Sequence, residues 1–141
     1  SVLAQETVGV NHERLIAALA ELKVDSVVIH YEGSGDSGDI AEWAVTPPEA
    51  MATLKVAKIS YRYIGNEYVA DQGYVYHADD RETTVFEALH DFALTWVESN
   101  HSGWEIHEGA CGQITIKVQE NTCELDHTEY YTDQTEYHYE L

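Results

Sequence analysis

The segment from Thr84 to Asn100 constrains the fold more than any other, because its pattern fits an amphipathic helix. Thr84 and Glu87 have the spacing of a capping box, which marks the start of a helix. Apolar residues then recur at helical spacing, and Gly103 follows the expected end. The apolar face consists of Phe86, Leu89, Phe92, Ala93 and Trp96.

A second helix and several strands complete the expected fold. The pattern predicts a helix from an N-cap at Asn11 to about Lys23. Runs of β-branched and aromatic residues predict strands at 27–31, 40–45, 54–64, 68–77, 113–118 and 122–128, with a last strand at the C-terminal end. Two main helices packed on one side of an antiparallel sheet are the economical arrangement, so we expect a single α+β domain over residues 1–141.

The last two hairpins determine which side chains share a face of the sheet. A two-residue loop at 120–121 would pair Ile114 with His127. In the final hairpin, a loop at 132–133 would place His127 opposite His138, whereas a loop at 132–134 would place it opposite Tyr139. A one-residue change in register turns every side chain to the other face. Only the longer loop puts the late tyrosines beside the apolar residues, so we expect that register.

The charge of the chain is strongly acidic and uneven. The chain carries 26 Asp and Glu against 7 Lys and Arg, a net charge of −19, and residues 71–141 hold 16 of the acids but 2 of the bases. Such a field repels nucleic-acid phosphates and anionic lipid and attracts basic protein surfaces. We therefore expect a basic protein partner, no direct nucleic-acid binding and no membrane binding. Acidity that serves solubility only is the competing explanation.

The sequence shows no targeting or membrane signal. It lacks a run of about 20 apolar residues, and residues 1–10 lack the basic and apolar regions of a signal peptide. Two cysteines, Cys111 and Cys123, are too few for a disulfide scaffold or a cysteine-rich zinc site. These features lead us to expect a cytoplasmic protein.

Acidic residues and tyrosines are mixed along the C-terminal strands, a pattern typical of a protein-binding surface. Tyrosine is favoured at interfaces because one end is apolar and the other forms hydrogen bonds. Spaced carboxylates can also imitate a phosphate backbone. A solvated sheet face above a half-buried aromatic layer is the alternative. The expected partner-binding residues are Glu124, Asp126, Glu129, Tyr130, Glu136, His138 and Glu140.

Carboxylates in the glycine-rich segment offer ligands for a hard cation. Glu32, Asp36 and Asp39 carry the oxygen ligands that Ca²⁺ or Mg²⁺ prefers, but their spacing is not that of an EF-hand. A tight glycine turn is therefore favoured, and no cofactor is expected. The eight histidines form no short zinc motif; only His101 and His107, on either side of a Gly-Trp pair, are close enough in sequence to converge.

The tetrapeptide at residues 35–38 reads Gly-Asp-Ser-Gly, as it does around the nucleophile of chymotrypsin-like proteases. In such enzymes the His and Asp of the triad precede the serine in a much longer chain, and a triad is recognised by geometry. Only His12 and His30 precede Ser37 here. We therefore expect no catalytic serine.

Three motifs spread over most of the chain carry a family resemblance. They are Tyr31-Glu32-Gly33-Ser34-Gly35-Asp36-Ser37-Gly38, then Gly103-Trp104-Glu105 with Gly109 and Gly112, then Leu125-Asp126-His127 with Glu129, Thr132 and Asp133. In these motifs the chain resembles a family of small acidic bacterial proteins, found on chromosomes, plasmids and phages, that is known only as a domain of unknown function. The resemblance implies a shared fold and no activity, and by analogy with other mobile-element proteins it allows an anti-defence role.

The resemblance also implies a shared surface, from which we predict a pocket. Its expected residues are Asp36, Ser37, Trp104, Glu105 and Asp133. The alternative for Trp104 is a loop that caps the core, with glycines that supply positive φ.

Two interpretations of function follow. The first is a non-enzymatic module that binds a basic protein surface, in its specific form as a nucleic-acid mimic or anti-defence protein. The second is a metal-dependent enzyme or ion-binding protein that uses Asp36, Glu105 and Glu129. No nucleophile and base can be paired, so no catalytic residue is expected and the first interpretation is favoured.

Overall fold

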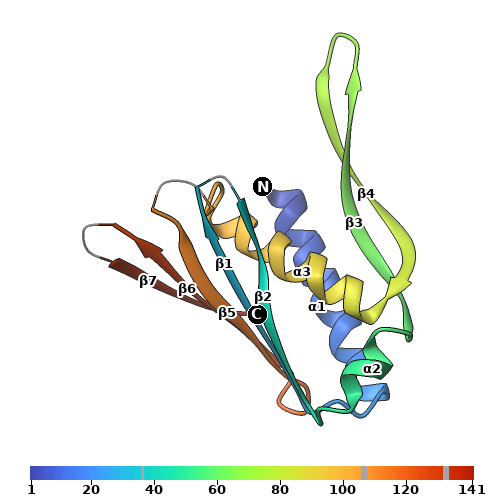
Figure 1. Ribbon diagram of the computed structural model, residues 1–141. Coiled ribbons are helices and arrows are strands. Elements are labelled where there is room, and N and C mark those ends of the chain that lie inside the picture. The colour runs from blue at the N-terminus through green and yellow to red at the C-terminus, as the bar shows by residue number, and fades with distance from the viewer. Residues whose placement is uncertain (36, 106–107, 132–133) are drawn as a thin grey trace.

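The chain forms three helices and seven strands in a computed structural model that describes residues 1–35, 37–105, 108–131 and 134–141 (Figure 1). The elements are α1 (Val2–Glu21), β1 (Ser26–Ser34), β2 (Ser37–Thr46), α2 (Ala50–Leu54), β3 (Lys58–Val69), β4 (Gly73–Thr84), α3 (Val85–Asn100), β5 (Ala110–Lys117), β6 (Thr122–Tyr130) and β7 (Gln134–Glu140). The α+β prediction is confirmed. None of the helices in the described ranges combines the length and the apolar composition that crossing a membrane requires.

Five strands form one antiparallel sheet in the order β2-β1-β5-β6-β7, and β3 and β4 form a separate hairpin. Helices α1 and α3 cover one face of the sheet, which we call the inner face (Figure 1). The side chains packed between this face and the helices include six that are 0% exposed: Leu19, Val27, Ile29, Leu89, Ile114 and Leu125. Burying each side chain of this size contributes about 1.5–3 kcal/mol relative to exposure, so this layer holds the domain together.

The predicted start of α3 is confirmed, with Thr84 as its N-cap. The Oγ1 of Thr84 accepts a hydrogen bond from the backbone N–H of Glu87 at 3.1 Å, and the helix ends at Asn100. A local signal sufficed here because capping involves only residues of the same turn.

The predicted N-cap at Asn11 is wrong. Helix α1 begins at Val2, where the Oγ of Ser1 accepts from the N–H of Ala4 at 3.2 Å. Asn11 lies inside the helix with 1% of its surface exposed. Its Nδ2 donates to the carbonyl oxygen of Arg62 at 2.8 Å, and the N–H of Arg62 donates to its Oδ1 at 2.9 Å. The two hydrogen bonds connect α1 to β3, and they explain why a polar residue occupies this buried position.

Two of the predicted strand boundaries are also wrong. The predicted strand at 68–77 contains the tip of a hairpin, because β3 runs to Val69 and β4 begins at Gly73. Gly73 has φ +77, which glycine adopts without strain. The predicted strand at 54–64 begins only at Lys58, since Ala50–Leu54 is helix α2. The distal part of this hairpin extends beyond the helices (Figure 1).

Both predicted registers are wrong by two residues. Ile114 pairs with Leu125, and His127 pairs with Gly112 on one side and with Tyr137 on the other. Because side chains alternate with a period of two, a shift of two keeps each residue on its predicted face. The apolar inner face is therefore as expected, but His127 faces a glycine in place of an isoleucine.

Replacing Asn11 by Ala should lower the free energy of unfolding by about 2 kcal/mol, because it leaves the N–H and the carbonyl of Arg62 without their partner. Urea unfolding of the variant measures this. Glu13→Ala, at an exposed position of the same helix, is the control and should change stability by less than about 0.5 kcal/mol. Equal effects of the two substitutions would contradict the assigned role.

Candidate functional site

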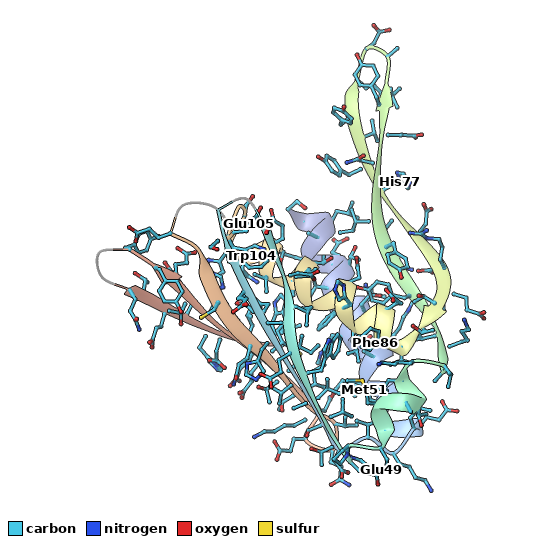
Figure 2. The ribbon with its side chains drawn as sticks, in the orientation of Figure 1. Glu49, Met51, His77, Phe86, Trp104 and Glu105 are labelled. Carbon is cyan, nitrogen blue, oxygen red and sulfur yellow. The ribbon has the colours of Figure 1, made fainter. Side chains whose placement is uncertain are left out.

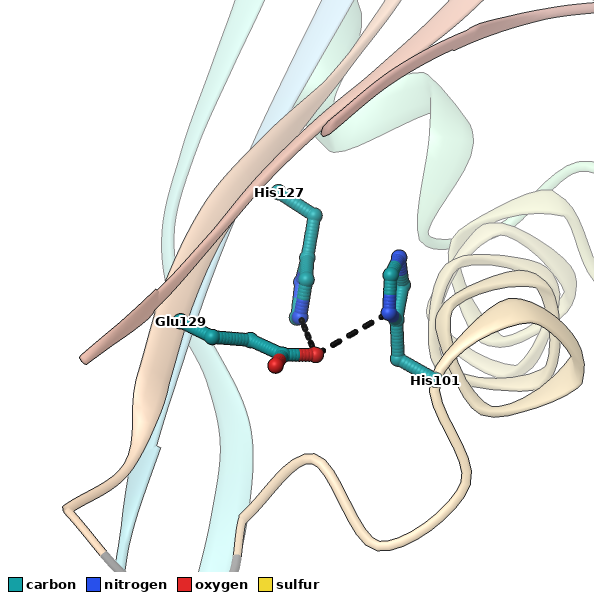
Figure 3. A group of neighbouring side chains, drawn as sticks. All are labelled: His101, His127 and Glu129. Carbon is teal, nitrogen blue, oxygen red and sulfur yellow. Dashed lines mark ion pairs between the residues drawn. The ribbon is translucent and has the colours of Figure 1, made fainter. Parts of the chain in front are cut away.

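A histidine pair and a carboxylate meet between the inner face of the sheet and the end of α3 (Figure 3). His101 is the C-cap residue of α3, and its N–H donates to the carbonyl of Val97. His127 and Glu129 lie two residues apart on β6, so both side chains point to the inner face. The helix end and the strand thus bring together residues that are 26 positions apart or more.

The three side chains are within ligand distance of one another. Glu129 Oε1 lies 3.0 Å from Nδ1 of His101 and 3.4 Å from Nε2 of His127. The two imidazole rings are stacked, with centroids 4.0 Å apart and planes at 17°. Each of the three residues offers one ligand atom, and these three atoms all lie within 4.8 Å of one another. Such a group could hold a metal ion.

Each of these three residues also has a tyrosine hydroxyl within hydrogen-bond distance. The hydroxyl of Tyr31 lies 2.5 Å from Nδ1 of His127, and that of Tyr139 lies 2.9 Å from Nε2 of His101. Tyr131 donates to Oε2 of Glu129 at 2.6 Å. The tyrosines fix the orientation of all three side chains, as groups behind metal ligands and catalytic residues do.

The centre is buried on one side and opens on the other. The side chain of His127 is 0% exposed and that of His101 is 8%, whereas Glu129 is 22% exposed. Among the described residues, the Nε2 of His127 has no hydrogen-bond partner. Glu129 borders a cavity of about 220 Å³, whose other lining residues are Ser102, Gly103, Trp104, Gly109, Tyr130 and Tyr131.

Burial and neighbouring groups set the charges of the centre. Burial, followed by the nearby His101, lowers the pKa of His127 to about 4. The hydrogen bond from Tyr131 is the largest influence that lowers the pKa of Glu129. At neutral pH the centre therefore presents a neutral imidazole at His127 and an ionised carboxylate at Glu129.

A glycine makes the contact between Tyr31 and His127 possible. Gly112 on β5 lies between the two strands and pairs with both residues. A Cβ at this position would lie 2.3 Å from the hydroxyl oxygen of Tyr31 and 2.3 Å from the carbonyl oxygen of Asp126. Only glycine lets the Tyr31 side chain cross β5 and reach the imidazole.

A second glycine position accepts Trp104. A Cβ at Gly38 in the β1–β2 hairpin would lie 2.3 Å from Cη2 of the indole. The Trp104 ring packs edge-on against Tyr31, with centroids 5.2 Å apart. Trp104 is 7% exposed and lies beside Glu105 (Figure 2). Residues of all three sequence motifs thus surround the histidine centre.

The predicted pocket residues divide among different places. Asp36 and Asp133 lie outside the described residues. Ser37, Trp104 and Glu105 line one cavity of about 540 Å³. Glu129 lines the cavity of about 220 Å³, which Trp104 also borders. The carboxylates of Glu105 and Glu129 therefore border different cavities.

Of the residues that offered ligands for a hard cation in the sequence, Glu32 and Asp39 line a cavity of about 740 Å³, and Asp36 lies outside the described residues. Asp39 accepts from the N–H of Ile40 at 2.7 Å, and its Oδ1 lies 2.9 Å from Nε2 of His90. Within the described part of the chain, neither residue belongs to a group of three converging ligand side chains.

The predicted partner-binding residues fall mainly on one face. Glu129 points inward, and the other six point away from the helices, on what we call the outer face. Pairing between β6 and β7 places Glu124 opposite Glu140 and Asp126 opposite His138. His138 Nδ1 lies 2.5 Å from Asp126 Oδ1, and hydrogen bonds to Asp126 and then Glu140 raise the pKa of His138.

The distal part of the β3–β4 hairpin, residues 65–77, is a further exposed surface that we call the arm (Figure 2). Its tyrosines Tyr68, Tyr74 and Tyr76 are 62–70% exposed. Tyr68 and Tyr74 are cross-strand partners and pack edge to face, with centroids 5.6 Å apart. Tyr76, two residues from Tyr74, lies on the same face. No Lys or Arg occurs between residues 63 and 80.

The sequence indicated His101 only together with His107, which lies outside the described residues, and neither the meeting of His101 with His127 and Glu129 nor the roles of Tyr31 and Tyr139 were predicted. The only available signal was the position of His101 immediately after the expected helix end, since a residue there can reach a neighbouring strand. Tyr31 and Tyr139 could not be found, because their contacts depend on register and on Gly112.

Comparisons with known proteins identify a family for this chain but assign it no activity. A family of unknown function (DUF6878) matches the chain over residues 7–141. No curated protein and no solved structure matches. The match confirms the resemblance that the three motifs indicated.

Gly112→Ala should destabilise the protein by about 2 kcal/mol or more, because the added Cβ has no space beside Tyr31 and the backbone of β6. Gly9→Ala is the matched control. A Cβ at Gly9 meets nothing within 4 Å, and alanine favours the helix, so this change should stabilise by up to about 1 kcal/mol. Thermal unfolding of both variants measures the difference, and a stable Gly112→Ala variant would contradict the packing described.

Replacing His127 by Phe should reduce the acid sensitivity of the fold. The unfolded chain takes up a proton near the ordinary pKa of 6.5, whereas the folded protein does so only at about 4. The free energy of unfolding therefore falls as the pH drops from 6.5 towards 4, because only the unfolded chain gains that proton. Urea unfolding at about pH 7.5 and about pH 5, with a chelator present, should show a smaller loss for the variant. An equal loss would contradict a buried, neutral His127.

Proposed function

The chain belongs to this family of unknown function, and we propose that it is a protein-binding module that engages a basic partner surface. The observation that carries the proposal is the grouping of six predicted contact residues on the outer face, which none of the helices in the described part of the chain covers (Figure 1). Four of them are carboxylates: Glu124, Asp126, Glu136 and Glu140. An uncovered sheet face of this charge is suited to a basic surface.

The charge of the whole chain supports a basic partner over other classes. A net charge of −19 repels nucleic acid and a second copy of the chain. In contrast, it speeds the encounter with a basic protein and makes that encounter sensitive to salt. The specific form of the proposal is a nucleic-acid mimic of anti-defence type, which would occupy the groove in which the partner holds phosphates.

The exposed arm supports the same function by a different contact. Exposed aromatic patches mark interaction sites, and tyrosine is among the residues that carry most of the binding energy at interfaces. The arm also lacks Lys and Arg between residues 63 and 80, so it too is suited to a basic partner. Variants on each surface distinguish the two contacts.

The test begins with a partner captured from host lysate at low salt, identified, purified and measured against the chain. Replacing Glu124, Glu136 and Glu140 by Gln should weaken binding about tenfold, because three carboxylates of one face are neutralised. The matched control neutralises Glu6, Glu13 and Glu21, which are exposed on α1, and changes the net charge equally. It should leave the affinity within about twofold of the original.

The outcomes separate the explanations. Equal losses in the two charge sets would mean that only the overall field matters, as would be expected if the acidity served solubility. Loss of binding with Tyr68, Tyr74 and Tyr76 replaced by Ser, but with the outer-face set unaffected, would assign the contact to the arm. Affinity that does not fall with salt would contradict charge-based recognition.

A further inference from the structure

We infer that His101, His127 and Glu129 form a binding centre for one divalent transition-metal ion of the Zn²⁺ type. This centre is distinct from the outer face and the arm, and it does not depend on the function proposed for them. His127 and Glu129 lie on the opposite face of β6 from Glu124 and Asp126, and His101 approaches that inner face from the end of α3. Figure 3 shows the two imidazoles and the carboxylate converging on one point from the strand and from the helix end.

The distances between the three side chains agree with a shared ion. Ligands about 2.1 Å from one ion lie about 2.9–3.4 Å apart in octahedral or tetrahedral geometry. The ligand atoms of the two histidines lie 3.0 and 3.4 Å from Glu129 Oε1. Small side-chain adjustments would therefore complete the geometry.

The unpartnered Nε2 of His127 is an independent sign of a ligand. This atom is buried and makes no hydrogen bond among the described residues, although Oε1 of Glu129 lies 3.4 Å away. A buried polar atom without a partner is costly and uncommon. If the only role of Glu129 were to form hydrogen bonds with the two histidines, Nε2 of His127 would have a hydrogen-bond partner. A metal ion bound between the three side chains would instead satisfy this nitrogen by coordination.

The tyrosines fit the requirements of metal-bound histidines. A histidine that binds metal through one nitrogen carries a proton on the other and donates it to a neighbouring group. For His127 that group would be Tyr31, and for His101 it would be Tyr139. Because a tyrosine hydroxyl both donates and accepts, each hydrogen bond persists when the ion binds.

The donor set and the cavity indicate the class of ion and the room around it. Two imidazoles and one carboxylate suit zinc and similar first-row metals, whereas Ca²⁺ and Mg²⁺ prefer oxygen ligands alone. Three protein ligands leave at least one position for water or a small ligand, as in zinc sites that are not closed. The cavity of about 220 Å³ at Glu129 provides space for it.

The test is a titration of the full chain, freed of metal by a chelator, with Zn²⁺ in a calorimeter and with Co²⁺ followed by visible absorption. We expect one ion per chain and a Co²⁺ spectrum with nitrogen ligation. His101→Gln and Glu129→Gln should each lower the affinity at least tenfold. Both keep a similar side-chain volume, and circular dichroism checks their folding. Tyr139→Phe should lower the affinity about 10-fold or more through the orientation of His101.

The matched control is His138→Gln in the exposed group of Glu124, His138 and Glu140 on the outer face, which also has three converging ligand atoms. It should leave the Zn²⁺ affinity unchanged. No binding of Zn²⁺ or Co²⁺ to the wild type, or binding that only His138→Gln weakens, would overturn the inference. Binding that none of the variants changes would overturn it equally, since the ion would then lie elsewhere.

Discussion

Coverage of a single face of the five-stranded sheet by α1 and α3 is the constraint on which the rest of this structure depends. Side chains alternate along each strand of this sheet, so every second one faces the helices and the others face away from them. Strand β6 shows the consequence most clearly. Its Leu125, His127 and Glu129 belong to the inner face, and its Glu124 and Asp126 to the outer face. One strand therefore contributes to a buried centre and to an acidic surface.

The buried centre depends in turn on a glycine in the strand between β1 and β6. Tyr31 reaches His127 across β5 only because residue 112 is glycine. Trp104 lies against the β1–β2 hairpin for the same reason at Gly38 and packs on Tyr31. This explains why two glycines and two aromatic residues that are far apart in sequence recur in the motifs: Gly38, Gly112, Tyr31 and Trp104. They shape the space around two histidines and one carboxylate.

The sequence predicted those parts of the fold that local rules decide. Helix α3 and its cap were predicted because a capping box involves one turn, and the inner face of β5–β7 because alternation has a fixed period. Asn11 was misinterpreted because its partner, the backbone of Arg62, is distant in sequence.

The registers were missed because a shift of two residues leaves the apolar pattern unchanged, and in the β5–β6 hairpin the turn with Asn121 at φ +55 sets the register. That two-residue difference leaves each side chain on its predicted face of the sheet, but it changes which residues lie next to His127. It places His127 beside Gly112, where Tyr31 can reach it. Glu129 was predicted as a contact residue for a partner, and its parity alone could have indicated that it points inward.

The inner histidine centre and the outer acidic face lie on opposite sides of one sheet, and nuclear magnetic resonance of the imidazole nitrogens tests their separate roles most directly. Long-range proton–nitrogen spectra would be recorded with and without one equivalent of Zn²⁺. We predict that the signals of His101 and His127 shift to those of metal-bound imidazoles with a proton on the nitrogen facing a tyrosine, while His138 is unchanged. A shift of His138 with His101 and His127 unchanged would contradict the account.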